Sequence, residues 1–437
     1  MAKLSTFQLI FIIVFVVFII GGTLIFAGYI KIGKDKTATP STDVPIVIWG
    51  TEKSILMKPL IDSLNSEKQL RLSYIEIPQD EFRSRLIDAF AEGEGPDLFL
   101  MEESDIWELR DKIYTIPYES YPERTFESTF VESAYVYEGP TGIVGVPFMI
   151  DPMVLYYNRD MFNDASIAVP PVSWSEFGLL TPKLTLKDET GTLFKSAIGM
   201  GRFENLVHGD DIYALLALQS GNPITVLDKE TGALTVTLAD LGEASSRSGG
   251  SYALDFFTSF ANPSNRNYTW NRGLADDFSS FITEHLAMYM GFASELPLIR
   301  AKNPNLNFDV TFVPQSGVTS TRMTIAHLSA FAVPKNAPNK AASISAAYQL
   351  TSKSVIEKLN TATLLPPVRR DLYATRPTDA FLSVYYDSAL QAKTWRNPSP
   401  VQVHSIFTEM ANALISGVAD SQSAVFDAVN KMTLLAQ

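Results

Sequence analysis

Short apolar runs alternate with helical patterns between residues 46 and 101, and this order constrains the fold more than any other feature of the sequence. Residues 46–49, 71–77 and 98–101 have the apolar or alternating character of strands. Between them, residues 53–65 and a segment that Asp80 is expected to cap place apolar side chains at helical spacing. A β-α-β-α-β order is typical of a doubly wound parallel sheet, so we expect an α/β fold.

The length and charge of the chain limit the classes of protein it can belong to. Because 437 residues exceed the size at which one core usually stops growing, we expect two lobes. The formal net charge of −13 and the lack of a basic cluster predict that the chain has no nucleic-acid partner. With no cysteine, the chain has no disulfide, no thiolate metal site and no cysteine that carries a lipid.

The N-terminal segment is apolar enough to span a membrane. Residues 7–30 include only Gln8 and Thr23 as clearly polar side chains, and we predict a membrane anchor helix within residues 1–32, followed by a polar linker over 33–45. A cleaved signal peptide is the alternative, but this run is longer than the usual apolar region of such peptides. Lysines are more numerous after the span than before it, so charge counting alone would place the C-terminal side in the cytoplasm.

Catalytic and metal-binding signatures are not evident in the sequence. His208, His285, His327 and His404 lie far apart and form no local metal-binding pair, so we predict structural roles for them and no metal site. Nucleophile-elbow, phosphate-loop and dinucleotide-binding motifs are missing, and we expect no cofactor. The pairs Glu102–Glu103 and Asp210–Asp211 leave a glycoside hydrolase open as an alternative.

A long stretch in the middle of the chain carries a family resemblance. Residues 145–177, GVPFMIDPMVLYYNRDMFNDASIAVPPVSWSEF, resemble the signature of family 1 extracellular solute-binding proteins, the maltose-binding-protein-like receptors of ABC importers. GPDLFL at 95–100, AMYMG at 287–291 and LPPVRRDL at 365–372 are similar to further segments of that family, in the same order. The resemblance therefore extends from about residue 45 to the C-terminus.

The resemblance implies a two-lobed type II periplasmic-binding-protein fold with discontinuous lobes. It places residues 44–150 plus 328–379 in the N-terminal lobe and residues 151–327 plus 380–437 in the C-terminal lobe, with a crossing at Asp151–Pro152. We also expect two amphipathic helices in the tail. In such a fold, a hinged cleft closes over a ligand that contacts both lobes.

The resemblance also implies a set of ligand-binding residues. They are Thr51, Glu52, Glu102, Glu103, Asp151, Asp210, Tyr213, Gly291, Phe292, Ser294, Glu295, Trp395 and Arg396. Sugar-binding members often carry a tryptophan after the AMYMG-like strand, and here Ser294 takes its place, so Phe292 or Trp395 would have to supply the stacking surface. Trp49 and Trp174 are expected in the core, and Trp270 is ambiguous.

The functional prediction is a membrane-tethered receptor. The resemblance implies capture of a carbohydrate or related polyol outside the cytoplasmic membrane and its delivery to ABC permease subunits, by a protein that is not an enzyme and is a monomer. That function sets the orientation, against charge counting, and the transmembrane span would replace the lipid anchor of many relatives. A membrane-bound sensor or adhesion module with the same fold is the alternative.

Overall fold

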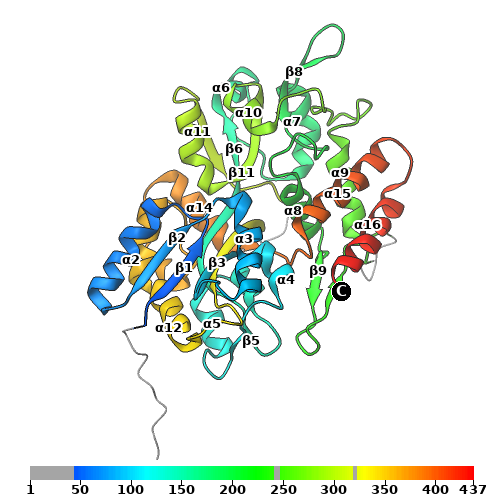
Figure 1. The fold of residues 1–437 in the computed structure, drawn as a ribbon. Coiled ribbons are helices and arrows are strands. Elements are labelled where there is room, and N and C mark those ends of the chain that lie inside the picture. The colour runs from blue at the N-terminus through cyan, green and yellow to red at the C-terminus, as the bar shows by residue number, and fades with distance from the viewer. Residues whose placement is uncertain (1–43, 241–246, 318–321) are drawn as a thin grey trace, which may run out of the picture. The chain divides into compact units, whose positions relative to one another are not determined.

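The computed structural model describes residues 44–240, 247–317 and 322–437. Within these ranges, no helix combines the length and apolar character needed to cross a membrane. The predicted span over residues 7–30 lies outside the described residues. Figure 1 shows the fold.

The alternating pattern at the start of the described chain forms the predicted elements. These are β1 (Ile46–Gly50), α2 (Ser54–Lys68), β2 (Leu72–Glu76), α3 (Gln79–Glu92) and β3 (Leu98–Glu102). Strand β1 pairs with β2 and β3 in parallel, which confirms the predicted parallel arrangement for these strands. The predicted cap by Asp80 is wrong, because extended Pro78 precedes the helix and Asp80 lies in its first turn.

The remaining elements complete an α/β fold. They are η1 (Glu103–Asp105), α4 (Ile106–Leu109), β4 (Ile116–Pro117), α5 (Glu123–Thr129), η2 (Glu132–Tyr137), β5 (Gly142–Ile143), β6 (Val146–Asn158), α6 (Arg159–Asp164), η3 (Trp174–Glu176), α7 (Phe177–Leu184), β7 (Leu186–Lys187), β8 (Leu193–Ile198), α8 (Gly209–Gln219), β9 (Thr225–Leu227), β10 (Leu234–Val236), α9 (Gly249–Ser259), α10 (Asp277–Ile282), β11 (Leu286–Phe292), η4 (Ala293–Glu295), α11 (Leu296–Lys302), β12 (Phe308–Thr311), β13 (Thr324–Ala332), α12 (Lys340–Leu350), α13 (Lys353–Thr363), η5 (Arg370–Leu372), α14 (Ala380–Gln391), β14 (Ala392–Lys393), α15 (Pro400–Ile415) and α16 (Ser421–Leu435). The last two are the predicted tail helices.

One mixed sheet connects the two lobes. Its order is β2-β1-β3-β13-β6-β11-β8-β7, with β12 paired to β6 and β14 paired to β13. Strand β13 runs antiparallel to both β3 and β6, so the sheet as a whole is not the parallel sheet that the first elements suggested. The long strands β6 and β13 lie at its centre, and they carry the chain from one lobe to the other.

Two separate hydrophobic clusters form the cores of the lobes. Within β6, core residues up to Ile150 belong to the cluster around β1–β3, and those from Met153 belong to the cluster around β8 and β11. Within β13 the change falls between Ile325 and Ala326. Segments far apart in sequence share a lobe: α12 packs near α2, and α16 packs against α9 and α15 (Figure 1).

The tryptophans only partly follow the expectation. Trp174 is buried beside Phe177, as predicted, whereas Trp49 is only partly buried because it lies on the less covered face of β1. Trp270 is fully buried and donates its indole N–H to Asn205 Oδ1 at 3.0 Å. Its ambiguous position is therefore a core position.

Candidate functional site

A cleft of about 1110 Å³ lies between the two lobes. One wall comes from the lobe built on β1–β3 and includes Leu56, Pro59 and Lys358, and the opposite wall includes His208 and Pro297. Ile55, at the start of α2, is 86% exposed, and together with Leu56 and Pro59 it forms an apolar rim of the cleft. Three further cavities, of about 460, 160 and 260 Å³, are smaller than this cleft.

The central strands of the sheet form the floor of the cleft. Ser329 of β13 lies opposite Glu102 of β3 and Met149 of β6, and His327 lies opposite Asp151 of β6. Directly opposed residues, and residues two apart on one strand, share a face of a sheet. All five therefore share the face that lines the cleft.

Three carboxylates, which we call the acidic triplet, line the cleft: Glu52, Glu102 and Asp151. Burial, followed by the charges of Glu102 and Asp151, raises the pKa of Glu52 to about 6. Burial also raises the pKa of Asp151 to about 6, although the Ser294 backbone N–H donates to its Oδ1 at 3.0 Å and favours the ionised form. Glu102 accepts a hydrogen bond from the Gln79 side chain at 2.9 Å.

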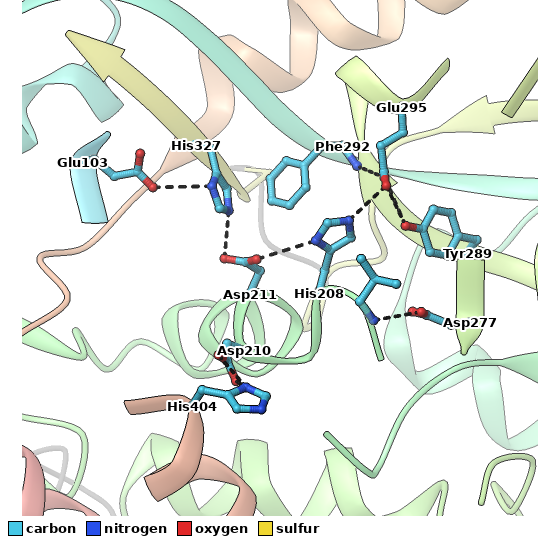
Figure 2. Close-up of polar contacts among 11 residues, drawn as sticks. Glu103, His208, Asp210, Asp211, Asp277, Tyr289, Phe292, Glu295, His327 and His404 are labelled. Atoms are coloured by element: carbon cyan, nitrogen blue, oxygen red, sulfur yellow. Dashed lines mark hydrogen bonds and ion pairs between the residues drawn. The ribbon is translucent and has the colours of Figure 1, made fainter. Parts of the chain in front are cut away.

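A second group of polar residues forms an imidazole–carboxylate chain: Glu103, His327, Asp211, His208 and Glu295 (Figure 2). Along it, Glu103 Oε1 lies 3.8 Å from His327 Nδ1, and His327 Nε2 lies 3.1 Å from Asp211 Oδ1. Asp211 Oδ2 lies 4.0 Å from His208 Nδ1, whose Nε2 is 3.2 Å from Glu295 Oε1. The chain crosses from the end of β3 in one lobe to the end of β11 in the other.

The alternation of acids and imidazoles favours charged forms along the chain. Burial opposes a charge on His327, but the carboxylates of Asp211 and Glu103 outweigh it and raise the pKa of His327 well above its usual value. Against burial, Glu295 raises the pKa of His208, and His327 lowers the pKa of Asp211. Glu103 differs, because burial raises its pKa to about 7.

Local hydrogen bonds and packing hold Glu295, the last member of the imidazole–carboxylate chain, in place. Glu295 Oε2 accepts the Phe292 backbone N–H at 2.8 Å, and its Oε1 accepts the Tyr289 hydroxyl at 2.9 Å. A side chain at Gly291 would collide with both Tyr289 and Glu295, so glycine is required there. Buried Asp277 accepts the Val207 backbone N–H at 2.9 Å and so holds the segment that carries His208.

The structure brings six of the predicted ligand-binding residues to the cleft. They are Glu52, Glu102, Asp151, Phe292, Ser294 and Glu295. Phe292 is only 4% exposed, and its ring packs edge-on against His208 and His327 with centroids 4.8 and 4.3 Å apart. Thr51 is partly buried next to Glu52, while Glu103 and Gly291 act through His327 and Glu295. Their roles as ligand contacts stay predictions.

The other predicted residues lie away from this cleft. Tyr213 is fully buried in the core of its lobe and donates to the Gly250 carbonyl at 3.2 Å, so the structure leaves it no surface for a ligand. Asp210 pairs with His404 at 3.0 Å.

Trp395 and Arg396 form contacts away from the main cleft. The Trp395 ring lies against Phe407, and Arg396 donates to the backbone carbonyls of Val136 and Glu138. Arg396 therefore connects backbone segments instead of facing the cleft, and burial lowers its pKa to about 10.

Sequence reasoning missed His208, His327 and Asp211. Two of the histidines predicted to be structural, His208 and His327, line the cleft. They are 119 positions apart in the chain, so no local spacing could have paired them. For His327 alone the sequence offered a signal, because the alternation of side chains along its strand brings residues 327 and 329 to one face.

One acidic cluster lies outside the cleft. Among the described residues, Glu123, Glu127 and Glu138 hold carboxylate oxygens within 4.8 Å of one another. The Lys229 ammonium already lies 2.6 Å from Glu123 and 3.0 Å from Glu138. The prediction that the protein holds no metal stays a prediction.

Two lobes, a mixed central sheet and a polar cleft between the lobes define the class of two-lobed solute-binding proteins. Residues 60–381 match the model of the family described as bacterial extracellular solute-binding protein. Since this match covers well over half of the chain, the chain belongs to that family, as the resemblance in the sequence predicted.

Solved structures of solute-binding proteins share the fold of this chain. The cyclic α-maltosyl-1,6-maltose-binding protein of Arthrobacter globiformis is 16% identical, with 90% of this chain and 99% of that chain covered and a TM-score of 0.73. A Thermotoga lettingae ABC-transporter solute-binding protein bound to α-D-tagatose is 19% identical, with 90% and 100% covered and a TM-score of 0.66. At these identities, the likeness shows the fold.

Curated relatives match over a shorter stretch. A binding protein of Brucella abortus is 26% identical over 110 residues, which are 24% of this chain and 26% of that protein. The chain thus matches about a quarter of the length of this relative.

Proposed function

We propose that the protein is a membrane-tethered, extracytoplasmic receptor that captures a carbohydrate or related polyol in the cleft and delivers it to an ABC importer. The cleft between the lobes carries this proposal, because it combines carboxylates and imidazoles with an apolar rim. Carboxylates accept hydrogen bonds from sugar hydroxyls, and apolar surfaces suit the C–H faces of sugar rings.

The proposed lobes are residues 44–150 plus 328–379 and residues 151–327 plus 380–437. The two hydrophobic clusters support this division, with α14 contributing Tyr385 to one and Ala389 to the other. Closure of the lobes would place the solute in contact with both walls and so stabilise the closed state. The protein acts by binding and is not an enzyme.

The ligand contacts proposed are those of the cleft. Phe292 and the rim formed by Ile55, Leu56 and Pro59 supply the apolar surface that the missing tryptophan supplies in many relatives. His208 and His327 join the six predicted residues of the cleft as polar contacts. Solved structures of similar fold are described with maltose-type oligosaccharides or tagatose, which supports a sugar as the solute.

Calorimetry on the full chain, in a detergent without a sugar headgroup, tests the proposal with a carbohydrate library. We expect at least one sugar to bind, and Phe292→Ala to weaken its binding about tenfold or more. The matched control is Phe194→Ala, at a half-exposed position outside the cleft, which leaves the affinity unchanged. If no carbohydrate binds, or if a bound sugar is hydrolysed, the proposal is wrong.

The proposed anchor and orientation have their own test. The apolar run over residues 7–30 supports an anchor helix. Because the chain contains no cysteine, a single Ser41→Cys substitution can be labelled specifically on intact cells with a membrane-impermeant thiol reagent. Labelling supports the outside location, and protection in intact cells with labelling after lysis would invert it.

A further inference from the structure

The lysines and imidazoles that line the cleft form ion pairs with carboxylates other than the acidic triplet, which leaves an excess of negative charge at the triplet. Of the two imidazoles in the cleft lining, His208 lies 3.2 Å from Glu295, and His327 lies 3.1 Å from Asp211, a carboxylate that is not part of the lining. Lys53 and Lys358 stand at the mouth, but Lys53 pairs with Glu76 at 3.1 Å and Lys358 with Glu67 at 3.2 Å, both outside the cleft. The excess charge therefore stays on the cleft wall.

The acidic triplet carries this excess. Its hydrogen-bond donors are neutral: the Gln79 side chain for Glu102 and the Ser294 backbone N–H for Asp151. Within the described part of the chain, none of the three carboxylates pairs with a lysine or arginine. The cation near Asp151 is His327, which is already shared with Asp211 and Glu103.

A buried hydroxyl gives a second, independent sign of a missing ligand. Ser329 is 8% exposed and lines the cleft, and its Oγ has no hydrogen-bond partner among the described residues. It lies between Glu102 and Met149 on neighbouring strands. A buried hydroxyl without a partner costs free energy, so a ligand that bonds to it gains affinity.

The spacing of the triplet suits an extended ligand and not a single metal ion. Three carboxylate oxygens within 4.8 Å of one another occur, in the described part of the chain, at Glu123, Glu127 and Glu138, but not in the cleft. A divalent cation needs its ligands on one small sphere. An organic solute with one charged group and several hydroxyls can instead reach separated acceptors.

We propose, as a step that rests on the proposed function, that the solute carries an amine: an amino sugar or aminated polyol whose ammonium group lies against Glu52, Glu102 and Asp151. Its hydroxyls bond to Ser329 and the nearby imidazoles, and the apolar face of its ring lies against Phe292 and the rim of α2.

The physical reason is the change of environment on closure. As the lobes close, water leaves the cleft and repulsion between the three carboxylates grows, because charges interact more strongly in a less polar medium. A neutral sugar can donate hydrogen bonds but cannot cancel that charge. An ammonium group does both, and charge-assisted hydrogen bonds are the stronger kind.

Matched ligand pairs test the proposal by calorimetry on the full chain, at pH 7.5 in a detergent without a sugar headgroup. The library pairs each amino sugar with its N-acetyl derivative, which keeps the ring and removes the charge. We expect amines to bind at least tenfold more tightly than their acetylated partners. Equal or tighter binding of the acetylated partners would overturn the amine proposal while leaving carbohydrate binding intact.

Charge-neutral variants locate the effect. Glu52→Gln and Asp151→Asn each lower the affinity for the amine at least tenfold and change the affinity for a neutral partner less than twofold. Glu94→Gln, the same change at an exposed position outside the cleft, alters neither affinity. If both variants of the triplet bind the amine as wild type does, the ammonium does not lie there and the proposal is wrong.

A salt titration of the wild-type chain covers the case in which a variant fails to fold. From 50 to 500 mM NaCl, binding of the amine weakens severalfold while that of the neutral partner is unchanged. The other outcomes separate the two proposals. Binding of spermidine but of no sugar would retain the charge argument and overturn the carbohydrate function, and a library without a single binder would overturn both.

Discussion

The acidic triplet lines the cleft together with His208, His327 and Glu295 of the imidazole–carboxylate chain, and the two groups solve the same electrostatic problem in opposite ways. In the chain, each imidazole lies between two carboxylates, so buried charges stabilise one another. In the triplet, burial and then the charges of Glu102 and Asp151 raise the pKa of Glu52, and the hydrogen-bond donors to Glu102 and Asp151 are neutral. The imidazole–carboxylate chain carries its own counter-charges, whereas the acidic triplet needs a counter-charge from solution.

The largest expected effect on stability comes from removing Asp211, the central carboxylate of the imidazole–carboxylate chain. Asp211→Ala leaves two imidazoles without the carboxylate between them, and since the His327 side chain is 43% exposed, the loss is about 2 kcal/mol of the free energy of unfolding. Urea unfolding at pH 6 measures it. The adjacent Asp210→Ala is the control: it removes the carboxylate partner of a single, half-exposed imidazole, that of His404, so the loss stays below about 1 kcal/mol. Equal losses for both variants would show that the imidazole–carboxylate chain stabilises the protein no more than the single Asp210–His404 pair does.

A substitution that changes no charge tests the packing around Glu295, the last member of the imidazole–carboxylate chain. Gly291→Ala pushes a methyl group into Tyr289 and the Glu295 carboxylate, and overpacking of this kind costs about 2 kcal/mol. Thermal unfolding measures the loss. Gly178→Ala, in helix α7 with open space around it, should instead stabilise slightly. A neutral Gly291→Ala would mean that Glu295 is not held as tightly as the geometry indicates.

Removing a charge from the acidic triplet should stabilise the unliganded protein, whereas Asp211→Ala and Gly291→Ala destabilise it. Since the pKa of Glu52 is raised from 4.5 to about 6 in the folded protein, the unfolded chain ionises first and the free energy of unfolding falls as pH rises through that window. Glu52→Gln should therefore stabilise the unliganded protein by about 1 kcal/mol at pH 7.5 and have little effect at pH 4.

Urea unfolding of wild type, Glu52→Gln and the exposed control Glu94→Gln at both pH values checks this prediction. The charged groups that face Glu52 are Glu102, Asp151 and Lys53, and only Lys53 favours its ionised form. A variant less stable than wild type at pH 7.5 would mean that Glu52 is satisfied within the protein.

The smallest expected effect comes from Tyr213→Phe, which tests whether Tyr213 is a core residue or a ligand contact. Tyr213→Phe removes one buried hydrogen bond to the Gly250 carbonyl and should cost at most about 1 kcal/mol of stability. It should leave the solute affinity within twofold of wild type, because Tyr213 has no surface in the cleft. A tenfold loss of affinity without a loss of stability would return Tyr213 to the list of ligand contacts.

Local patterns in the sequence predicted the local elements well. The first β-α-β-α-β unit follows from apolar periodicity, and the rule that ligands bind beyond the carboxyl ends of strands placed Glu52 and Glu102 correctly at the cleft. Asp80 failed as a cap because Pro78 already sets the extended residue before the helix. Tyr213 failed because α8 is buried on nearly all sides, so its sequence does not indicate one face.

The chain of imidazoles could not be predicted from the sequence. Its members come from η1, α8, η4, β13 and the segment before α8, and only the crossing of β6 and β13 between the lobes brings them together. Single histidines far apart in sequence carry no local signal. The same crossing sets Ser329 beside Glu102, which joins the two regions compared above.

Native mass spectrometry of the purified full chain tests the central claim most directly, namely that the cleft holds a solute whose charge completes the acidic triplet. We predict that the wild-type protein carries a small amine-containing solute, and that the Glu52→Gln and Asp151→Asn variants, purified in parallel, have lost it while Glu94→Gln retains it. A solute retained equally by all four proteins would contradict the account.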